Sequence, residues 1–215
     1  YNQQSEEGAI REKQHIEIVN KAGAIMIGPN CSGFFNTNHQ SIFTRPIPSL
    51  DTNGVDIISS SGGTITYIIE SAMRIGLRFN SAWSIGNAAQ IGIEDILEYL
   101  DKEFDPETSP KIKLLYLEKI SNPDRFLLHS SSLINKGCKI AAIKSGSSTS
   151  GSRAASSHTG AIASSDSAVE ALVRKAGIIR CYSREELANV AAVLTLKKIN
   201  GRNLAIITQA GGPAV

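Results

Sequence analysis

Short apolar runs alternate with helical patterns along most of this chain. The strand-type runs are residues 55–58, 82–85, 113–118, 139–143 and 178–181. The helical patterns are residues 65–75, 93–100, a segment opened by Pro123, residues 166–176, and a last segment with a capping box at Ser183 and Glu186. Parallel strands need helical crossovers and are buried on both faces, which makes them short and apolar. The alternation therefore predicts an α/β fold with a flavodoxin-like parallel five-stranded sheet and helices on both faces.

The patterns at the two ends of the sequence predict parts of further α/β units. A helix over residues 6–22 leads into a predicted strand at 24–27 and the turn Gly28-Pro29-Asn30. That order is half of a βαβ unit. At the other end, a buried-strand pattern at 204–208 runs into a glycine turn. We expect the sequence to be a fragment of a longer protein.

Composition narrows the class of protein. Of the 215 residues, 41% are apolar and 20% charged, and the net charge is +2. These values are typical of a globular chain and give no electrostatic footprint for nucleic acid. No apolar run approaches the roughly 20 residues that span a bilayer. The three cysteines fit neither a disulfide framework nor a zinc site, so the expectation is a reduced, cytoplasmic protein without a metal site.

A serine-glycine turn follows the first central strand. Ser61, Gly62 and Gly63 lead directly into the helix at 65–75. The N–H groups at a helix N-terminus point outward and the helix dipole favours an anion there, so the turn is a candidate phosphate site. The alternative is a tight strand-to-helix turn in which a serine only caps the helix.

A carboxylate closes the third strand. Glu118 ends the apolar run over 114–117, at the edge where parallel sheets bind ligands. The alternative is a glutamate that meets solvent or pairs with Lys119.

A long connection follows the fourth strand. Residues 144–160 are rich in serine and glycine, show no periodicity, and contain one lysine, one arginine and His158. A connection this long inside an α/β domain is functional or disordered. A histidine on such a segment, near an anion site and a carboxylate, favours group transfer through a covalent intermediate. His15, His39 and His129 lack such surroundings and are predicted to be surface residues.

An ordered series of short motifs resembles the nucleoside-diphosphate-forming acyl-CoA synthetases. This superfamily includes the succinyl-CoA synthetase α subunit and ADP-forming acetyl-CoA synthetases. The motifs are Gly28-Pro29-Asn30-Cys31, Ser61-Gly62-Gly63, Ser84-Ile85-Gly86-Asn87, Tyr116-Leu117-Glu118, Lys144-Ser145-Gly146, Ser157-His158-Thr159-Gly160 and Ala210-Gly211-Gly212-Pro213. The sequence departs from the family pattern at Ser60, Ala88 and Gln90, and Tyr67 aligns with a family tyrosine only after a one-residue slip.

The resemblance implies roles for individual residues. His158 would be the phosphorylated histidine, Glu118 the glutamate that supports it, and Ser61, Gly62 and Gly63 the phosphate-binding turn. A further set would lie near the acyl substrate and CoA: Asn30, Cys31, Asn87 and Lys144. The family reaction converts acyl-CoA, phosphate and ADP into acid, CoA and ATP, through an acyl phosphate and a phosphohistidine.

The resemblance also implies a domain order. Residues 1–48 would end a Rossmann-like CoA-binding domain, 54–200 would form the ligase domain with the histidine loop at 144–160, and 201–215 would begin a second ligase-type domain. The nucleotide and its Mg²⁺ would bind to an ATP-grasp domain or subunit, and the complete enzyme would be an oligomer. The competing interpretation is a non-catalytic CoA-sensing module of the same fold.

Overall fold

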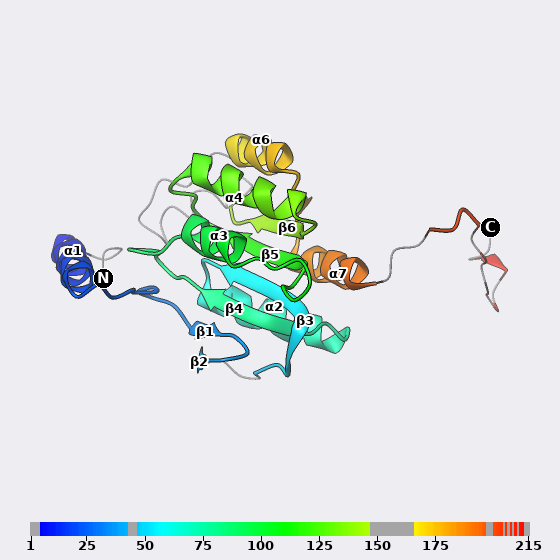
Figure 1. Cartoon of the computed structure of the whole chain (residues 1–215), viewed down its shortest axis with the longest axis horizontal. Coiled ribbons are helices and arrows are strands. Elements are labelled where there is room, and N and C mark those ends of the chain that lie inside the picture. The colour runs from blue at the N-terminus through cyan, green and yellow to red at the C-terminus, as the bar shows by residue number, and fades with distance from the viewer. Residues whose placement is uncertain are drawn as a thin grey trace.

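The computed structural model describes residues 5–42, 47–146, 166–196 and 200–203, together with 205, 207, 209, 211 and 212. Its centre is a seven-stranded sheet in the order β2-β1-β4-β3-β5-β6-β7 (Figure 1). The strands are β1 (Gly33–Phe35), β2 (Gln40–Ile42), β3 (Leu50–Ser59), β4 (Phe79–Ser84), β5 (Ile112–Leu117), β6 (Lys139–Lys144) and β7 (Ile179–Cys181). The helices are α1 (Glu6–Lys21), α2 (Gly62–Arg74), α3 (Ile93–Lys102), α4 (Pro123–Asn135), α6 (Asp166–Ala176) and α7 (Arg184–Thr195).

The five predicted central strands are all present, and every neighbouring pair among them is parallel. Counted among themselves, they follow the order 2-1-3-4-5, which is the flavodoxin order. The strand order reverses between β3 and β5. The flavodoxin-like prediction is therefore confirmed, and the switch point at which such sheets bind ligands lies at the carboxyl ends of these two strands.

The sheet has two more strands than predicted. β1 pairs antiparallel with β4, and β2 pairs antiparallel with β1. The two strands contribute Phe35 and Ile42 to the hydrophobic core, where at most 9% of the surface of each residue is exposed. Three-residue strands are too short for a period-two pattern to stand out, and the sequence analysis missed them. Both lie within residues 1–48, so the sheet continues across the expected domain boundary, and the division into domains stays a prediction.

The predicted strand at residues 24–27 is wrong. These residues form no strand, and Ile25 is 75% exposed. A run of four apolar residues becomes a strand only where a partner strand pairs with it, and the sequence alone does not supply one. The predicted strand at 204–208 lies largely outside the described residues.

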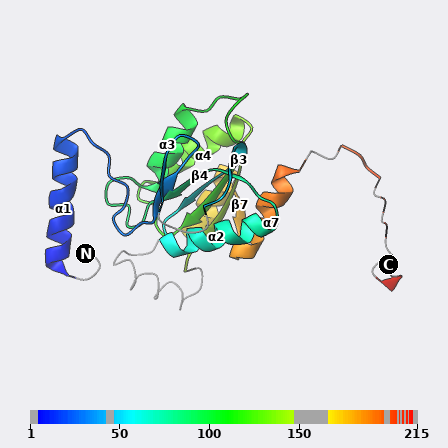
Figure 2. The same ribbon diagram turned by 90° about the horizontal axis from the view of Figure 1, so that it is seen from below.

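Helices cover both faces of the sheet (Figure 2). On one face α2 and α7 pack together over Ile57 and Leu114, and on the other α3, α4 and α6 pack over Ile58 and Leu115. Successive strand residues thus alternate between two separate cores, which explains why these strands are apolar throughout.

The predicted helix starts at Pro123 and Ser183 are confirmed: Pro123 is the first residue of α4, and Ser183 caps α7 through the Glu186 N–H. The helix predicted from residue 65 begins earlier, at Gly62, where the Ser61 side chain caps α2 by accepting a hydrogen bond from the Thr64 N–H. Because α2, α4 and α7 follow the parallel strands β3, β5 and β7, their N-termini lie at the carboxyl edge of the sheet, where the connecting turns begin.

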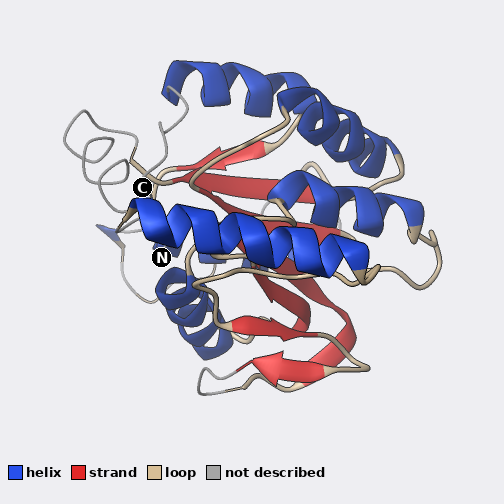
Figure 3. Ribbon diagram, turned by 90° about the vertical axis from the view of Figure 1, so that its left-hand side faces the viewer, coloured by secondary structure: helices blue, strands red, loops and turns tan. Residues whose placement is uncertain are grey.

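α1 lies apart from the other helices and in front of the sheet in Figure 3. Within the part of the chain that the structure describes, no helix is long and apolar enough to cross a membrane.

Candidate functional site

The turn after β3 is built by its own serines. Ser59 donates its hydroxyl to the Ser61 carbonyl (2.8 Å) and accepts from the Ser61 N–H (3.1 Å). The Ser60 N–H donates to the Tyr116 carbonyl of β5 at 3.2 Å. The N–H groups of Gly62 and Gly63 fall in the first turn of α2, so they have no acceptor within the helix. The predicted anion site is therefore a hydrogen-bonded turn in which the N–H groups of Gly62 and Gly63 have no acceptor within the helix.

The two glycines of this turn differ in their surroundings. A β-carbon on Gly62 would lie 2.3 Å from the Ser32 hydroxyl oxygen. A β-carbon on Gly63 would meet nothing within 4 Å, and Gly63 is exposed. Because Gly62 has no side chain, Ser32 can pack directly against the turn. At Gly63, by contrast, the N-terminal end of α2 is open to solvent.

Two loops, at residues 28–30 and 86–89, are joined to each other by backbone hydrogen bonds beside this turn. The Asn87 N–H donates to the Pro29 carbonyl (2.9 Å), and the Ala89 N–H donates to the Gly28 carbonyl (3.0 Å). Gly86 has a φ of +56°, and a β-carbon there would lie 2.2 Å from the Pro29 carbonyl oxygen. Only glycine fits that position.

The two joined loops bring together residues that are distant in the sequence. The Asn30 side-chain amide donates to the Asn87 side-chain oxygen at 3.3 Å, and the Cys31 thiol lies 3.6 Å from the Ile27 carbonyl oxygen. The Ser32 N–H donates to the buried Ser84 hydroxyl at 3.0 Å. Three of the four residues that the sequence analysis placed near CoA thus share one corner with the Ser61–Gly63 turn.

Gln90 fastens the N-terminal segment to this corner. Its side-chain oxygen accepts from the Met26 N–H (2.6 Å), and its amide donates to Asn20 at the end of α1 (2.7 Å). The sequence analysis assigned no role to this departure from the family pattern. A neutral amide supplies both the donor and the acceptor that this bridge uses.

Glu118 and Lys144 lie on neighbouring strand ends. Leu117 pairs with Lys144 in the β5–β6 register, and the Ser145 N–H donates to the Leu117 carbonyl at 2.8 Å. Glu118 is half-buried and directly follows Leu117 in the chain. It therefore lies just after the end of β5, at the carboxyl edge of the sheet, as its place in the sequence predicted. Lys144 is farther from the loop corner than the sequence analysis expected, because β3 and β5 lie between β4 and β6.

Lys144 is an unusual lysine. It is only 4% exposed, and its ammonium donates to the Ser145 carbonyl at 2.5 Å. Burial lowers its pKa, Arg180 lowers it further, and the carboxylates of Asp166 and Glu118 act in the opposite direction. A buried lysine side chain therefore lies at the point where the chain leaves β6.

His158 lies outside the described residues, so its predicted place beside Glu118 stays a prediction. Of the other three histidines, His15 and His39 are exposed as predicted. His129 is not: it is 9% exposed, and its Nδ1 lies 2.9 Å from Asp101. It lies on the face of α4 that packs against α3, a pairing that only the tertiary structure shows.

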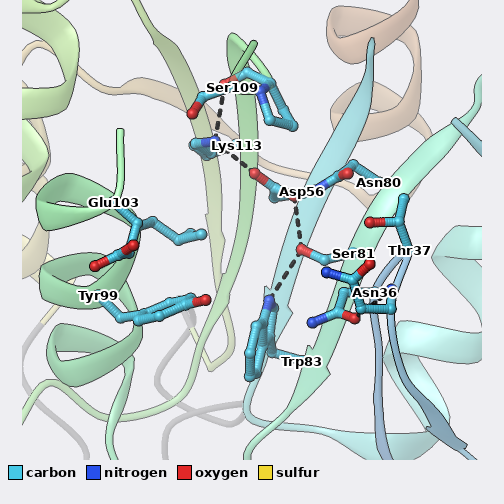
Figure 4. A pocket seen from close by; sticks show the side chains of 13 residues that line it. Asn36, Thr37, Asp56, Asn80, Ser81, Trp83, Tyr99, Glu103, Ser109 and Lys113 are labelled. Carbon is cyan, nitrogen blue, oxygen red and sulfur yellow. Dashed lines mark hydrogen bonds and ion pairs between the residues drawn. The ribbon is translucent and has the colours of Figure 1, made fainter. Parts of the chain in front are cut away.

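A polar cavity of about 170 Å³ opens on the face that α3 covers (Figure 4). At its floor the Lys113 ammonium lies 2.5 Å from a carboxylate oxygen of Asp56, and both side chains are at most 1% exposed. Asp56 also accepts from Asn80 (2.8 Å) and Ser81 (2.6 Å), so its charge is fully paired. Asp56 lies near the amino end of the parallel part of β3, where these sheets do not usually bind substrates.

Among the described residues, no group of three or more His, Cys, Asp or Glu side chains is arranged to hold a metal ion. Cys31 is partly exposed, Cys138 and Cys181 are buried, and all three thiols are free in the structure.

A family model and a solved structure are similar to this chain over most of its length. The family model described as "Succinyl-CoA ligase like flavodoxin domain" matches residues 52–194. A solved structure of an acetyl-coenzyme A synthetase from Ca. Korarchaeum cryptofilum, in complex with phosphate and ADP, superposes with a TM-score of 0.80 and 28% identity. That match covers 94% of this chain and 43% of the other.

Curated relatives are ADP-forming acyl-CoA ligases. Acetate–CoA ligase [ADP-forming] I of Archaeoglobus fulgidus is 36% identical over 97% of this chain and 30% of its own length. The α subunit of acetate–CoA ligase [ADP-forming] II of Pyrococcus furiosus is 35% identical over 100% of this chain and 46% of its own length. A 4-hydroxybutyrate–CoA ligase [ADP-forming] of Nitrosopumilus maritimus is 33% identical over 100% of this chain. The chain spans less than half the length of these relatives.

Proposed function

This chain belongs to the succinyl-CoA-ligase-like flavodoxin domain family, and on that basis we propose that it forms the ligase domain of an ADP-forming acyl-CoA synthetase. Its curated relatives carry that activity in their names, on acetate or on 4-hydroxybutyrate.

The proposed reaction has three steps. Phosphate attacks the acyl-CoA thioester, which gives an acyl phosphate and releases CoA. An imidazole nitrogen of His158 then takes the phosphoryl group and releases the carboxylate. ADP finally accepts the phosphoryl group from the histidine and becomes ATP, so the free imidazole is restored. The steps balance without a redox partner.

The described residues supply positioning and charge. The free N–H groups at Gly62 and Gly63 bind phosphate oxygens, and the dipole of α2 favours their negative charge. Glu118 accepts a hydrogen bond from the imidazole nitrogen that does not carry the phosphoryl group, which stabilises the positive ring. Phosphoryl transfer needs mainly such positioning and electrostatic stabilisation.

One observation supports the proposal most strongly. The open turn at Gly63 stands at the end of β3, and Glu118 follows β5, the strand paired with β3 across the switch point. A phosphate-binding turn and the carboxylate that would support a phosphohistidine thus lie at the same edge of the sheet. The related acetyl-coenzyme A synthetase of Ca. Korarchaeum cryptofilum was solved with phosphate and ADP.

The remaining substrates and partners are part of the proposal. Asn30, Cys31 and Asn87 form the corner that we assign to CoA or the acyl group, with Lys144 at the adjacent strand end. Nucleotide and Mg²⁺ bind to an ATP-grasp domain or subunit, in an oligomeric cytoplasmic enzyme. Relatives that are named as α subunits are consistent with a separate partner chain.

The test uses the complete protein with acyl-CoA and ³²P-labelled phosphate. We expect a protein-bound label that is labile in acid and stable in base, as phosphohistidine is. His158→Asn should abolish the label, and Glu118→Gln should reduce it at an unchanged melting temperature. His15→Asn, on the exposed side of α1, is the control and should label as the wild type does.

A label that persists in His158→Asn would exclude this histidine as the carrier. If the wild-type protein takes up no label but binds CoA, the chain is instead a CoA-sensing module of the same fold.

A further inference from the structure

The polar cavity under α3 has a floor that three neighbouring strands build. In the register of the sheet, Asp56 of β3 pairs with Ser81 of β4 and with Lys113 of β5. Ile58, two residues after Asp56, belongs to the core under α3, so these side chains lie on the face that α3 covers. Asp56, Ser81 and Lys113 are each at most 1% exposed, although a cavity of about 170 Å³ opens above them.

Hydrogen bonds join this floor to the aromatic wall of the cavity. Ser81 donates to Asp56 at 2.6 Å, and the indole N–H of Trp83 donates to the Ser81 hydroxyl oxygen at 2.9 Å (Figure 4). The Trp83 ring also stacks on Phe34, with 5.0 Å between the ring centroids, and meets the Tyr99 ring edge-on at 6.0 Å. The floor and the wall are therefore held in one arrangement by contacts within the protein.

Stability alone does not explain why this place is polar and open. Burying the ion pair of Asp56 and Lys113 costs solvation energy, and apolar side chains of similar volume often stabilise a fold as well or better. The open volume above the pair also forgoes the packing contacts that a filled core provides. A concave site with fixed polar groups and aromatic walls is instead the usual form of a small-molecule site.

The floor can both donate and accept hydrogen bonds. The Lys113 ammonium carries three hydrogens, and its bonds to Asp56 and to the Pro110 carbonyl (2.8 Å) use two of them. Asn80 uses its amide group on Asp56, which leaves its side-chain oxygen as an acceptor. The base of the cavity can therefore donate to a ligand through Lys113 and accept from it through Asn80.

The rim has the same mixture of groups. Asn36, in the turn between β1 and β2, accepts with its side-chain oxygen from the N–H groups of Asn38 and His39 (2.9 and 2.8 Å), which leaves its amide group to donate. On the opposite side, the hydroxyl of Tyr99 points toward the tryptophan of the wall and can do either (Figure 4). Because a hydroxyl group both donates and accepts, a ligand rich in hydroxyl groups satisfies this lining.

The charges around the cavity favour a neutral ligand. Asp56 and Lys113 neutralise each other at the floor, and the other charged residue of the described lining, Glu103, is negative. α3 ends at Lys102, so its C-terminus, which is the negative end of the helix dipole, lies beside Glu103. These features oppose phosphates, carboxylates and nucleotides, and the Lys113 ammonium opposes a cation at the floor.

We propose that this cavity binds a neutral, cyclic polyhydroxyl compound such as a monosaccharide. Its volume of about 170 Å³ is below the roughly 300–1,000 Å³ of sites for drug-sized ligands. At about 30 Å³ for each water, it corresponds to about five or six waters, which is the size of one sugar ring with its hydroxyl groups. The apolar faces of such a ring pack on Trp83 and Tyr99, and its hydroxyl groups bond with Asn36, Asn80 and Lys113.

The site is separate from the proposed phosphate turn. Asp56 precedes Ser59, the last residue of β3, by three positions, which is roughly 10 Å along a strand. Ser61, Gly62 and Gly63 follow the end of that strand. The anionic compounds of the proposed reaction do not match the lining, so the inference goes beyond the proposed function and does not rest on it.

The test follows Trp83 itself, the only tryptophan of the 215 residues. The complete protein is labelled with fluorotryptophan, and the ¹⁹F NMR signal that disappears in Trp83→Phe is the signal of this residue. The probes are D-ribose, D-glucose and myo-inositol. Tetramethylammonium chloride and sodium acetate are the cationic and the anionic control.

We expect at least one polyhydroxyl probe to shift the Trp83 signal in a saturable way, and the two salts to leave it in place. Asn80→Ala and Tyr99→Phe should each raise the apparent Kd by about 2- to 12-fold, the effect of one lost hydrogen bond. Asn53→Ala and Tyr182→Phe are the matched controls and should keep the wild-type Kd, because both residues are exposed and lie outside the lining.

A Trp83 signal that no polyhydroxyl probe shifts would overturn the inference, and so would a saturable shift with either salt in place of the sugars. Equal Kd values in Asn80→Ala, Tyr99→Phe and the controls would overturn it as well, since the probe would then bind elsewhere. If Asn80→Ala does not fold, Tyr99→Phe decides, because Tyr99 is 50% exposed and loses only a hydroxyl group. These readouts use neither acyl-CoA nor a histidine label, so a failure here leaves the proposed function standing.

Discussion

Gly62 and Ser32 are in such close contact that a β-carbon on the glycine would stand 2.3 Å from the serine hydroxyl oxygen. The contact joins the turn at the start of α2 to the segment that leads into β1. It therefore links the proposed phosphate turn to the loops that carry Asn30 and Asn87. The proposed site depends on this glycine for the packing against Ser32 as well as for the N–H group that has no acceptor within the helix.

Gly62→Ala should destabilise the fold by about 1–2 kcal/mol, because the added methyl group displaces Ser32. Gly63→Ala is the control at the next position, where nothing lies within 4 Å. It should leave stability unchanged or raise it by up to about 1 kcal/mol, as alanine favours helix over glycine. Urea unfolding measures both variants. Replacing Ser32 with alanine in the Gly62→Ala background should restore part of the loss; if it worsens the loss, the contact is not the cause.

The buried pair of Asp56 and Lys113 gives a second prediction. Lys113→Met leaves Asp56 buried without its cation and should cost about 3–5 kcal/mol. The double variant Asp56→Leu/Lys113→Met should be more stable than Lys113→Met, since no unpaired charge remains. Arg78→Met is the control: its partner is Asp51, Arg78 is 70% exposed, and its loss should cost at most about 1 kcal/mol. Equal costs for Lys113→Met and Arg78→Met in urea unfolding would contradict the argument.

The α3–α4 interface should make stability sensitive to acid. Burial would raise the pKa of Asp101, but hydrogen bonds from His129, Lys136 and Ser132 outweigh it and lower the pKa below the usual 3.8. Glu98 accepts from Lys102 and Arg125, which lowers its pKa to about 2. A carboxyl group with a lowered pKa in the folded state stabilises the fold above about pH 4 and loses that effect as the pH falls.

The free energy of unfolding should thus decrease from about pH 5 toward pH 2. Asp101→Asn should be less stable at pH 7 and should show a shallower decrease. Chemical unfolding at a series of pH values measures the slope. A variant slope as steep as that of the wild type would show that Asp101 does not contribute to it.

Thiol labelling separates the three cysteines. Burial raises the pKa of Cys138 and Cys181, the latter to about 11, and both side chains have no exposed surface. Cys31 is partly exposed at the loop corner. At pH 8 a maleimide should therefore modify one cysteine rapidly in the native protein, and Cys31→Ser should remove that reaction. Mass spectrometry after digestion identifies the site; rapid modification of Cys181 would contradict the described packing. Protection of Cys31 by CoA would support the corner that we assign to it.

Much of this architecture is encoded locally. Apolar strand runs, helix periodicity and caps such as Ser61 and Ser183 act over a few residues, so the sequence predicted the five parallel strands and their helices. The alternation of strands and helices also predicted which residues follow the strands at the carboxyl edge of the sheet, namely Ser61, Gly62, Gly63 and Glu118. The run at 24–27 misled the prediction because an apolar segment forms a strand only beside a partner strand.

The contacts between distant residues were decided by the tertiary structure. Asn30 meets Asn87, Gln90 meets Met26, and Arg180 meets Asp166 across 57, 64 and 14 positions of sequence. No local pattern encodes such pairs. In the unfolded chain these polar side chains hydrogen-bond with water, and only tertiary packing brings one particular partner within reach. Local sequence patterns thus encode the type and order of the elements and the chemistry available at the ends of the strands. Only the folded sheet, by setting strand order and register, determined which of those groups stand together.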